Sequence, residues 1–202
     1  MATVAADRTK SENAALEQTD ARRVRFDVDE YGRMADAGIF HEDSRVELID
    51  GEILEMSPIG SRHVGIVARL TGLLTRRLGA RIVLLVQSPV RLSESSEPQP
   101  DLALAKPRPD TYTKSLPGPK DLSLLIEVMD SSADFDRGVK LGLYARAKIA
   151  EVWLVDLNDE TVASHHGPRN GLYSEVHTFT RGESLAPQAF PKVKFRVDAI
   201  LS

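Results

Sequence analysis

The stretch SSEPQPDLALAK, residues 95–106, places an acid, Asp101, directly after a proline and at the start of an apolar run. Its leucines alternate with smaller residues, and this alternation predicts a strand with a buried face. A second apolar run, LSLLIEVMD at residues 122–130, carries Glu127 in a strand expected to be buried on both faces. Because an unpaired carboxylate is costly to bury, both acids require an explanation.

Outward from these two strands, the chain alternates between helical and strand periodicities. Apolar residues recur every three or four positions from His63 to Leu78, where Gly79 ends the pattern, and this predicts an amphipathic helix. The other expected elements are a helix at 26–38, a hairpin at 46–56, strands at 82–86 and 151–156, a helix at 134–148 capped by Asp134 or Asp136, and short strands at 161–166, 172–179 and 192–197. This order predicts an α+β fold in which helices pack on a mixed β-sheet.

The composition is that of one domain of ordinary stability, with 202 residues of which 42% are hydrophobic. We expect residues 1–23 to form a disordered tail, because they mix both charge signs without apolar periodicity, and residues 24–202 to form the domain. The absence of cysteine excludes disulfides, thiolate metal sites and a cysteine nucleophile. No segment resembles a membrane span or a signal peptide, so we expect a cytoplasmic protein without membrane contact.

The hairpin carries a third acid in an apolar setting. Asp50-Gly51 lies between two apolar runs and is a strong signal for a two-residue hairpin turn. That turn places Glu47 across from Leu54, on a face shared with Ile49. Such a position is unfavourable for a charge unless the charge interacts with another group.

A divalent cation would resolve the cost of burying Asp101 and Glu127. Mg²⁺ is held in proteins by one or two carboxylates and keeps several waters, one of which a phosphate can replace. We therefore interpret Asp101 and Glu127 as candidate ligands of Mg²⁺, or of Mn²⁺, at the ends of two strands.

Several motifs taken together resemble a known family, the Uma2 family of restriction-endonuclease-like proteins. They are, in chain order, RVELIDGEILEMSP (45–58), RHVGIVARL (62–70), QPDLAL (99–104), LLIEVMDSS (124–132) and DRGVKLGLYARAKIAEVWLVD (136–156). The resemblance implies the PD-(D/E)xK nuclease fold, a restriction-endonuclease-like mixed β-sheet flanked by helices, here with an N-terminal β-hairpin. It also implies that Pro100-Asp101 begins the catalytic motif and that Glu127 is its second acid.

The chain departs from the motif at Met129, where the resemblance implies a lysine. Lys140 and Tyr144 are four residues apart in the following helix and share a face with Arg137. The resemblance therefore transfers the role of the missing lysine to Lys140. It also places three further residues near the cation, Glu47 as an additional acid and Gln99 or Gln87 as a partner of a metal-bound water.

Together with these residues, the resemblance implies a metal-dependent endonuclease that hydrolyses phosphodiester bonds in nucleic acid, with DNA as the expected substrate. The net charge is −4 and the pI about 5.8, so contact with nucleic acid must use local basic patches or bound cations. The candidate patch lies in the proline-rich loop 106–121, at Lys106, Arg108, Lys114 and Lys120. We also expect a homodimer, because the C-terminal strands offer edges that need covering.

Two other functional hypotheses stay open. A protein that keeps the nuclease fold but acts only as a binding or scaffold module would account for Met129. A glycosidase using Asp101 and Glu127 fits less well, because aromatic residues, which sugar sites use for stacking, make up only 5% of the chain.

Five smaller features also bear on the site. His63 reads as a capping or surface histidine rather than a catalytic one. Arg62, Arg69 and Arg76 recur every seven residues, either as a phosphate-facing stripe or as a solvated helix face. Trp153 is expected in the core, and Tyr144 either in the core or with its hydroxyl at the site. The adjacent pair His165-His166 is a weak metal signal, because neighbours in a strand point to opposite faces.

Overall fold

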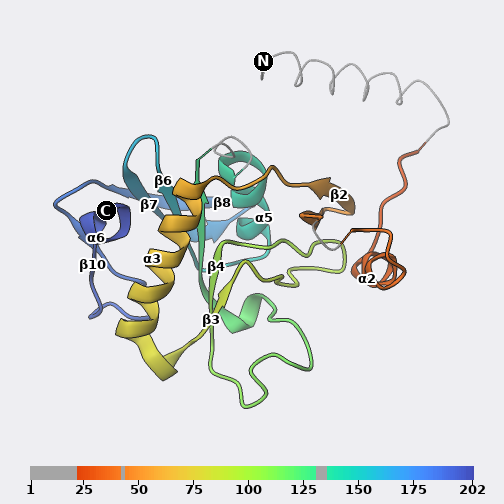
Figure 1. Ribbon diagram of the computed structural model, residues 1–202, viewed down its shortest axis with the longest axis horizontal. Helices are drawn as coiled ribbons and strands as arrows, with labels where there is room; N and C mark the ends of the chain where they lie inside the picture. Colours follow the sequence, from red (N-terminus) through yellow and green to blue (C-terminus); the bar gives the residue numbers. More distant parts are fainter. Residues whose placement is uncertain (1–21, 42–43, 131–135) are drawn as a thin grey trace.

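The structure, a computed structural model, describes residues 22–41, 44–130 and 136–202 (Figure 1). Nearly all of the expected tail and the candidate cap Asp134 lie outside these residues, as do the side chains of Asp136 and Arg137. The elements are α2 (Val28–Asp36), β1 (Val46–Ile49), β2 (Glu52–Glu55), α3 (Ser61–Leu78), η1 (Gly79–Arg81), β3 (Val83–Val86), β4 (Leu102–Ala105), η2 (Pro119–Asp121), β5 (Leu122–Met129), η3 (Asp136–Lys140), α5 (Leu141–Arg146), β6 (Glu151–Asp156), β7 (Thr161–Arg169), β8 (Leu172–Phe179), β9 (Ser184–Leu185), β10 (Phe195–Arg196) and α6 (Val197–Leu201).

A six-stranded mixed sheet forms the centre of the domain, in the order β3-β4-β5-β6-β7-β8. Only β5 and β6 are parallel within it, because η3 and α5 cross over the sheet between them, and the other pairs are antiparallel. Helices α3 and α6 lie on one side of this sheet and α5 on the other (Figure 1). The predicted α+β fold with a mixed sheet flanked by helices is confirmed.

The alternation of side chains along the central strands divides the core into two layers. Leu124 and Ile126 of β5 pack toward α3, whereas Leu125 and Met129 pack toward α5. Trp153 of β6 is fully buried in the α3 layer, as the sequence predicts. Glu127 falls on the α5 face of β5, so the same alternation that builds the core aims this acid toward the crossover segment.

The N-terminal hairpin has the predicted turn and register. Asp50 and Gly51 both adopt positive φ angles, of 49° and 82°, as the mirror-image two-residue turn requires. Glu47 pairs with Leu54 across β1 and β2. The hairpin is attached to the segment before β4, because the backbone N–H of Glu97 donates to the carbonyl of Leu48 at 2.8 Å.

The two long helical predictions differ in outcome. Helix α3 begins two residues before His63 and ends at Leu78, with Gly79 at φ 52° ending it as expected. The continuous helix expected at 134–148 is instead a π-helical segment, Asp136–Lys140, followed by a short α-helix that ends at Arg146. The wider π-helical turn changes the angular spacing on which the predicted shared face of residues 137, 140 and 144 was based.

No helix in the described ranges is both long and apolar enough to span a bilayer.

A buried acid outside the candidate site provides a test of the core. Glu151 is fully buried, and its carboxylate accepts hydrogen bonds from the indole N–H of Trp153, the hydroxyl of Ser164 and the backbone N–H of Gln188. Burial raises the pKa of Glu151 above its ordinary value of 4.5, although these donors favour the charged form.

We predict that Glu151→Gln changes the pH dependence of stability. The folded state holds the Glu151 proton more tightly than the unfolded state does. The stabilisation that protonated Glu151 contributes to the folded state is therefore lost as the pH rises above 4.5. The free energy of unfolding of the wild type, relative to that of Glu151→Gln, should therefore fall between pH 4.5 and 8 in urea titrations. A constant or growing difference would contradict this assignment.

Candidate functional site

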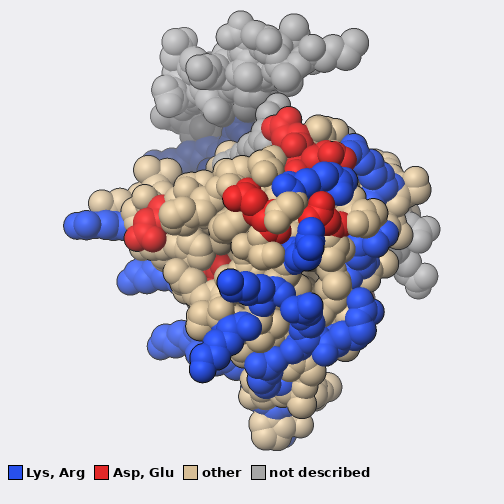
Figure 2. All heavy atoms as spheres, turned by 90° about the vertical axis from the view of Figure 1, so that its left-hand side faces the viewer, with Lys and Arg blue, Asp and Glu red and all other residues tan. Residues whose placement is uncertain are grey.

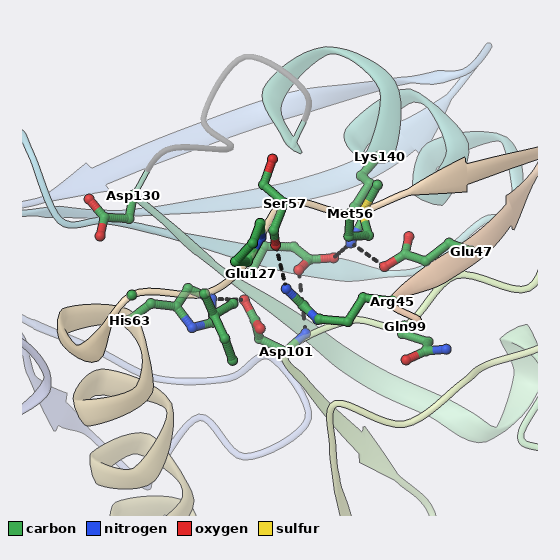
Figure 3. A pocket seen from close by; sticks show the side chains of 13 residues that line it. Arg45, Glu47, Met56, Ser57, His63, Gln99, Asp101, Glu127, Asp130 and Lys140 are labelled. Atoms are coloured by element: carbon green, nitrogen blue, oxygen red, sulfur yellow. Dashed lines mark hydrogen bonds and ion pairs between the residues drawn. The ribbon is translucent and has the colours of Figure 1, made fainter. Parts of the chain in front are cut away.

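A pocket opens at one end of the sheet, where the hairpin, the start of α3 and the ends of β4 and β5 meet (Figure 3). The charged and polar residues that line it are Arg45, Glu47, Ser57, His63, Gln99, Asp101, Glu127, Asp130 and Lys140. The structure thus brings Asp101, Glu127, Lys140 and Glu47 together, although they lie up to 93 positions apart in the chain.

Asp101, directly before β4, is held by partners from three parts of the chain. Its Oδ2 accepts a hydrogen bond from the backbone N–H of Val128 at 2.8 Å and lies 3.0 Å from Nε2 of His63. Its Oδ1 accepts a hydrogen bond from the side chain of Gln87 at 3.3 Å. The side chain is buried, and these contacts meet much of the cost of removing its carboxylate from water.

Glu127 is likewise held by protein groups. Its Oε2 accepts a hydrogen bond from the backbone N–H of Asp101 at 3.3 Å, which places the two acids side by side. Its Oε1 accepts a short hydrogen bond from the hydroxyl of Tyr144 and lies 3.3 Å from Nζ of Lys140. Tyr144 is also fully buried in the α5 layer, so both interpretations of this residue hold.

Lys140 joins the sheet to the hairpin. Its ammonium lies 3.1 Å from Oε1 of Glu47, and both side chains are almost completely buried. This ion pair with Lys140 explains the unfavourable position of Glu47 in the hairpin.

A tyrosine of α2 also senses the acids near the hairpin. Burial, followed by the negative charges of Glu97 and Glu47, raises the pKa of Tyr31. The hydroxyl of Tyr31 therefore stays protonated and donates to the carbonyl of Val46 at 2.9 Å.

Met129, at the position where the resemblance implies a lysine, is buried in the core. It packs in the same apolar cluster as Leu143, Tyr144 and Leu154. A lysine at this position would place its charge in that cluster, whereas Lys140 reaches Glu127 from the crossover segment.

The interpretation of His63 as a capping or surface residue is wrong. His63 is only 6% exposed, lines the pocket and contacts Asp101. Its Nδ1 is buried without a hydrogen-bond partner in the described part of the chain. The sequence did hold a signal, because His63 is three and four residues before Ile66 and Val67 and so shares the buried stripe of α3.

Arg45 was missed by the sequence analysis, because a single arginine before a short strand has no distinguishing pattern. Its side chain extends across the pocket between the hairpin and the two acids (Figure 3). One guanidinium nitrogen donates to the carbonyl of Ser57 at 2.7 Å. Of the two candidate glutamines, Gln87 bonds Asp101, whereas Gln99 lines the pocket and donates to the carbonyl of Val46 at 3.4 Å.

The basic loop 106–121 lies away from the pocket. Ala105 pairs with Leu122 and Leu102 with Ile126, so the loop joins the strands at the end opposite to Asp101 and Glu127. Several of its cations are also engaged within the loop. Lys106 donates to the carbonyl of Lys120 at 2.6 Å, and Arg108 bonds Asp110 at 2.5 Å and stacks 3.9 Å from the ring of Tyr112.

The chemistry of the donors suits a hard divalent cation held by two carboxylates. Asp101 and Glu127 are adjacent, and a carboxylate pair that leaves room for waters and phosphate oxygens is a common way to hold Mg²⁺. No group of three or more His, Cys, Asp or Glu side chains placed to hold a metal occurs within the described ranges. A cation would therefore depend on water or substrate for its remaining ligands, and it would compete with Lys140 for Glu127.

Comparisons with known proteins agree with the architecture. The model of the Uma2 family, described as "Putative restriction endonuclease", matches residues 28–198. A crystal structure from Anabaena variabilis ATCC 29413, described as "a putative nuclease belonging to DUF820", is similar with a TM-score of 0.66 and 12% sequence identity. The alignment covers 87% of this chain and 97% of that chain, and at this identity it supports the fold alone. No curated protein matches the chain at a significant level.

We predict that Lys140→Met destabilises the protein by about 3 to 5 kcal/mol, because it leaves the buried carboxylates of Glu47 and Glu127 without their cation. The double variant Glu47→Gln/Lys140→Met should recover part of this loss, since it removes one uncompensated charge. Urea unfolding of the wild type, Glu47→Gln, Lys140→Met and the double variant measures the coupling energy between Glu47 and Lys140. Strictly additive losses would show that the buried ion pair contributes nothing to stability.

Proposed function

Because the chain belongs to the Uma2 family, we propose that it is a metal-dependent endonuclease that hydrolyses phosphodiester bonds in nucleic acid, with DNA as the substrate. The observation that carries the proposal is the pair of adjacent buried acids, Asp101 and Glu127, with the ammonium of Lys140 at 3.3 Å from Glu127 in the same pocket. The family and the similar fold of a described nuclease support the reaction class.

In this proposal Asp101 and Glu127 hold Mg²⁺ or Mn²⁺. When bound, such an ion lowers the pKa of a coordinated water and neutralises charge on the phosphate. His63 and the backbone N–H of Val128 fix the orientation of the Asp101 carboxylate, and Tyr144 does the same for Glu127. The residues of the pocket therefore supply an oriented carboxylate pair before any ligand binds.

Lys140 and Arg45 supply positive charge near the reacting phosphate. The ammonium of Lys140 contacts Glu127 and so lies where it can stabilise negative charge that develops in the transition state. The guanidinium of Arg45 extends across the pocket and can donate to phosphate oxygens in a forked geometry. We assign Lys140 the role of the motif lysine and Arg45 a role in binding the phosphate.

The scaffold hypothesis is the alternative, and Met129 is its main support. In that case the protein would keep the fold and the ion pairs of the pocket, and it would bind its partner without cleaving it. The two hypotheses differ in one observable, which is cation-dependent strand cleavage by the purified protein.

We predict that the wild type cleaves nucleic acid only with Mg²⁺ or Mn²⁺, in assays with double-stranded DNA, single-stranded DNA and RNA. Asp101→Ala should lose both cation binding, measured by calorimetry, and cleavage, because it removes a ligand. Lys140→Met should retain cation binding and lose about 10²- to 10³-fold in rate, because it removes a cation aimed at the transition state.

Asp36→Ala, which changes an exposed acid of α2 outside the pocket, is the matched control and should behave as the wild type. Absence of cleavage by the wild type on every substrate would favour the scaffold hypothesis. Full activity of Lys140→Met would remove Lys140 from the mechanism and leave it as a structural ion-pair partner.

We also propose that the protein is a homodimer, joined through β8. This strand is an outer strand of the six-stranded sheet, and its side chains Leu172 and Val176 are 72% and 51% exposed. Antiparallel pairing of β8 with its copy about Val176 would oppose Glu175 of one protomer to His177 of the other.

Sedimentation velocity should show a dimer for the wild type at micromolar concentration and a monomer for Val176→Lys. The control Val64→Lys changes an equally exposed valine on α3 and should leave the dimer intact. A monomeric wild type, or a dimeric Val176→Lys, would rule out this interface.

A further inference from the structure

Two segments of the chain carry many cations and no acids. Residues 56–93 contain no Asp or Glu, and their cations are Arg62, Arg69, Arg76, Arg77, Arg81 and Arg91. Residues 184–197 also lack acids, and their cations are Lys192, Lys194 and Arg196. Since the whole chain has a net charge of −4, positive charge is concentrated in these segments rather than spread evenly.

The two segments pack against each other at the end of α3, which brings cations of both segments close together. Arg77, in the last turn of α3, donates to the carbonyl of Lys194 at 2.6 Å, and its guanidinium lies 5.8 Å from the ring centre of Phe195. The guanidinium of Arg81 lies 5.3 Å from the ring centre of Phe190. We call this surface the basic face, defined by Arg69, Arg76, Arg77, Arg81, Lys192 and Lys194.

Figure 2 views the side of the molecule that carries α3 and the C-terminal segment. Lys and Arg side chains gather across its lower part, whereas most of the Asp and Glu side chains visible on this side lie above them. Arg69, Arg76, Lys192 and Lys194 are exposed, so their charges face solvent. Arg196 is excluded from the basic face because it pairs with Asp198 at 3.0 Å.

The basic face extends from the pocket along α3. His63, in the first turn, lines the pocket. At 1.5 Å per residue, Arg69 lies about 9 Å and Arg76 about 20 Å farther along the helix axis. The two arginines point to nearly the same side, because a separation of seven residues turns the helix by almost two complete turns. Arg62 lies nearest the pocket but is engaged, since it donates to the carbonyl of Leu157 and to Asn158.

The pocket alone offers little net attraction to a polyanion. Its lining includes the acids Glu47, Asp101, Glu127 and Asp130, against the cations Arg45 and Lys140. A nucleic acid must therefore gain most of its electrostatic binding energy outside the pocket, and the cations of loop 106–121 lie at the other end of β4 and β5. The basic face begins at Arg69, about 9 Å along α3 from His63, and neither of its two segments contains an acid.

We propose that the basic face binds the sugar–phosphate backbone of a nucleic-acid duplex and holds the duplex along α3, so that one strand reaches the pocket. This inference rests on the proposed nuclease function for its substrate. A duplex carries about one negative charge per 1.7 Å, so the 20 Å from His63 to Arg76 spans about twelve phosphate charges. Neutralising several of these charges releases counterions, which makes the binding depend strongly on salt.

The test removes four exposed cations of the basic face with Arg69→Gln, Arg76→Gln, Lys192→Gln and Lys194→Gln in one variant. Arg77 and Arg81 are kept, because they pack on aromatic rings and a change there could alter the fold. The matched control removes four exposed cations elsewhere, with Arg33→Gln, Lys114→Gln, Lys148→Gln and Arg169→Gln. Both variants change the net charge equally, and the control includes a cation of loop 106–121.

Binding is measured by fluorescence anisotropy with a labelled 30-base-pair DNA in EDTA, over a series of NaCl concentrations. For the basic-face variant, the slope of log affinity against log salt should decrease by about 0.9 for each phosphate that the variant no longer neutralises, and so by about 2 to 4 in total. The control variant should keep the wild-type slope. Circular dichroism and urea unfolding establish that both variants are folded.

Equal losses in both variants would overturn the proposal, because net charge alone would then account for the binding. Binding to vesicles of anionic lipid but not to DNA would also overturn it. The result is separable from the nuclease proposal, since cleavage plays no part in EDTA. A wild type that binds DNA through the basic face without cutting it under any cation would leave this inference standing while the proposed reaction failed.

Discussion

The buried ion pairs of Lys140 with Glu47 and Glu127 are the interaction on which the site depends. They join three parts of the fold, namely the hairpin, the central strand β5 and the crossover segment between β5 and β6. Each charge alone would be costly at this depth, whereas together they offset one another. These three parts are therefore constrained together, because removing Lys140 leaves two buried carboxylates without their cation.

The same network sets the conditions under which a cation can bind. Glu127 already interacts with Lys140 and Tyr144, and Asp101 with His63 and a backbone N–H, so a divalent ion gains less at these carboxylates than at bare ones. Mg²⁺ commonly completes its coordination with water and substrate phosphates. We therefore expect weak cation binding to the free protein and stronger binding with nucleic acid present, a coupling that would favour catalysis only when the substrate is in place.

Much of the architecture follows from local patterns in the sequence. The Asp50-Gly51 turn predicts the hairpin register, and the three-and-four periodicity of α3 predicts its buried stripe. Other features depend on contacts between distant segments. His63 lies on the buried stripe, but periodicity does not tell which strand that stripe covers, so its contact with Asp101 could not be predicted. The antiparallel pairing of β4 with β5 places loop 106–121 at the end of these strands away from the pocket, and the sequence did not specify this pairing. Lys140 was found because the family pattern pointed to it, whereas the π-helical turn that carries it was not expected.

In the proposed mechanism Asp101 and Glu127 together hold the catalytic divalent ion. A crystal structure of the wild type soaked with Mn²⁺, with data collected at an energy where manganese scatters anomalously, would locate this ion. We expect an anomalous peak in contact with the carboxylates of both Asp101 and Glu127, and its absence in crystals of Asp101→Asn. A peak held by other residues, or no peak even at Mn²⁺ concentrations far above those that saturate cleavage, would rule out this pair as the ligands.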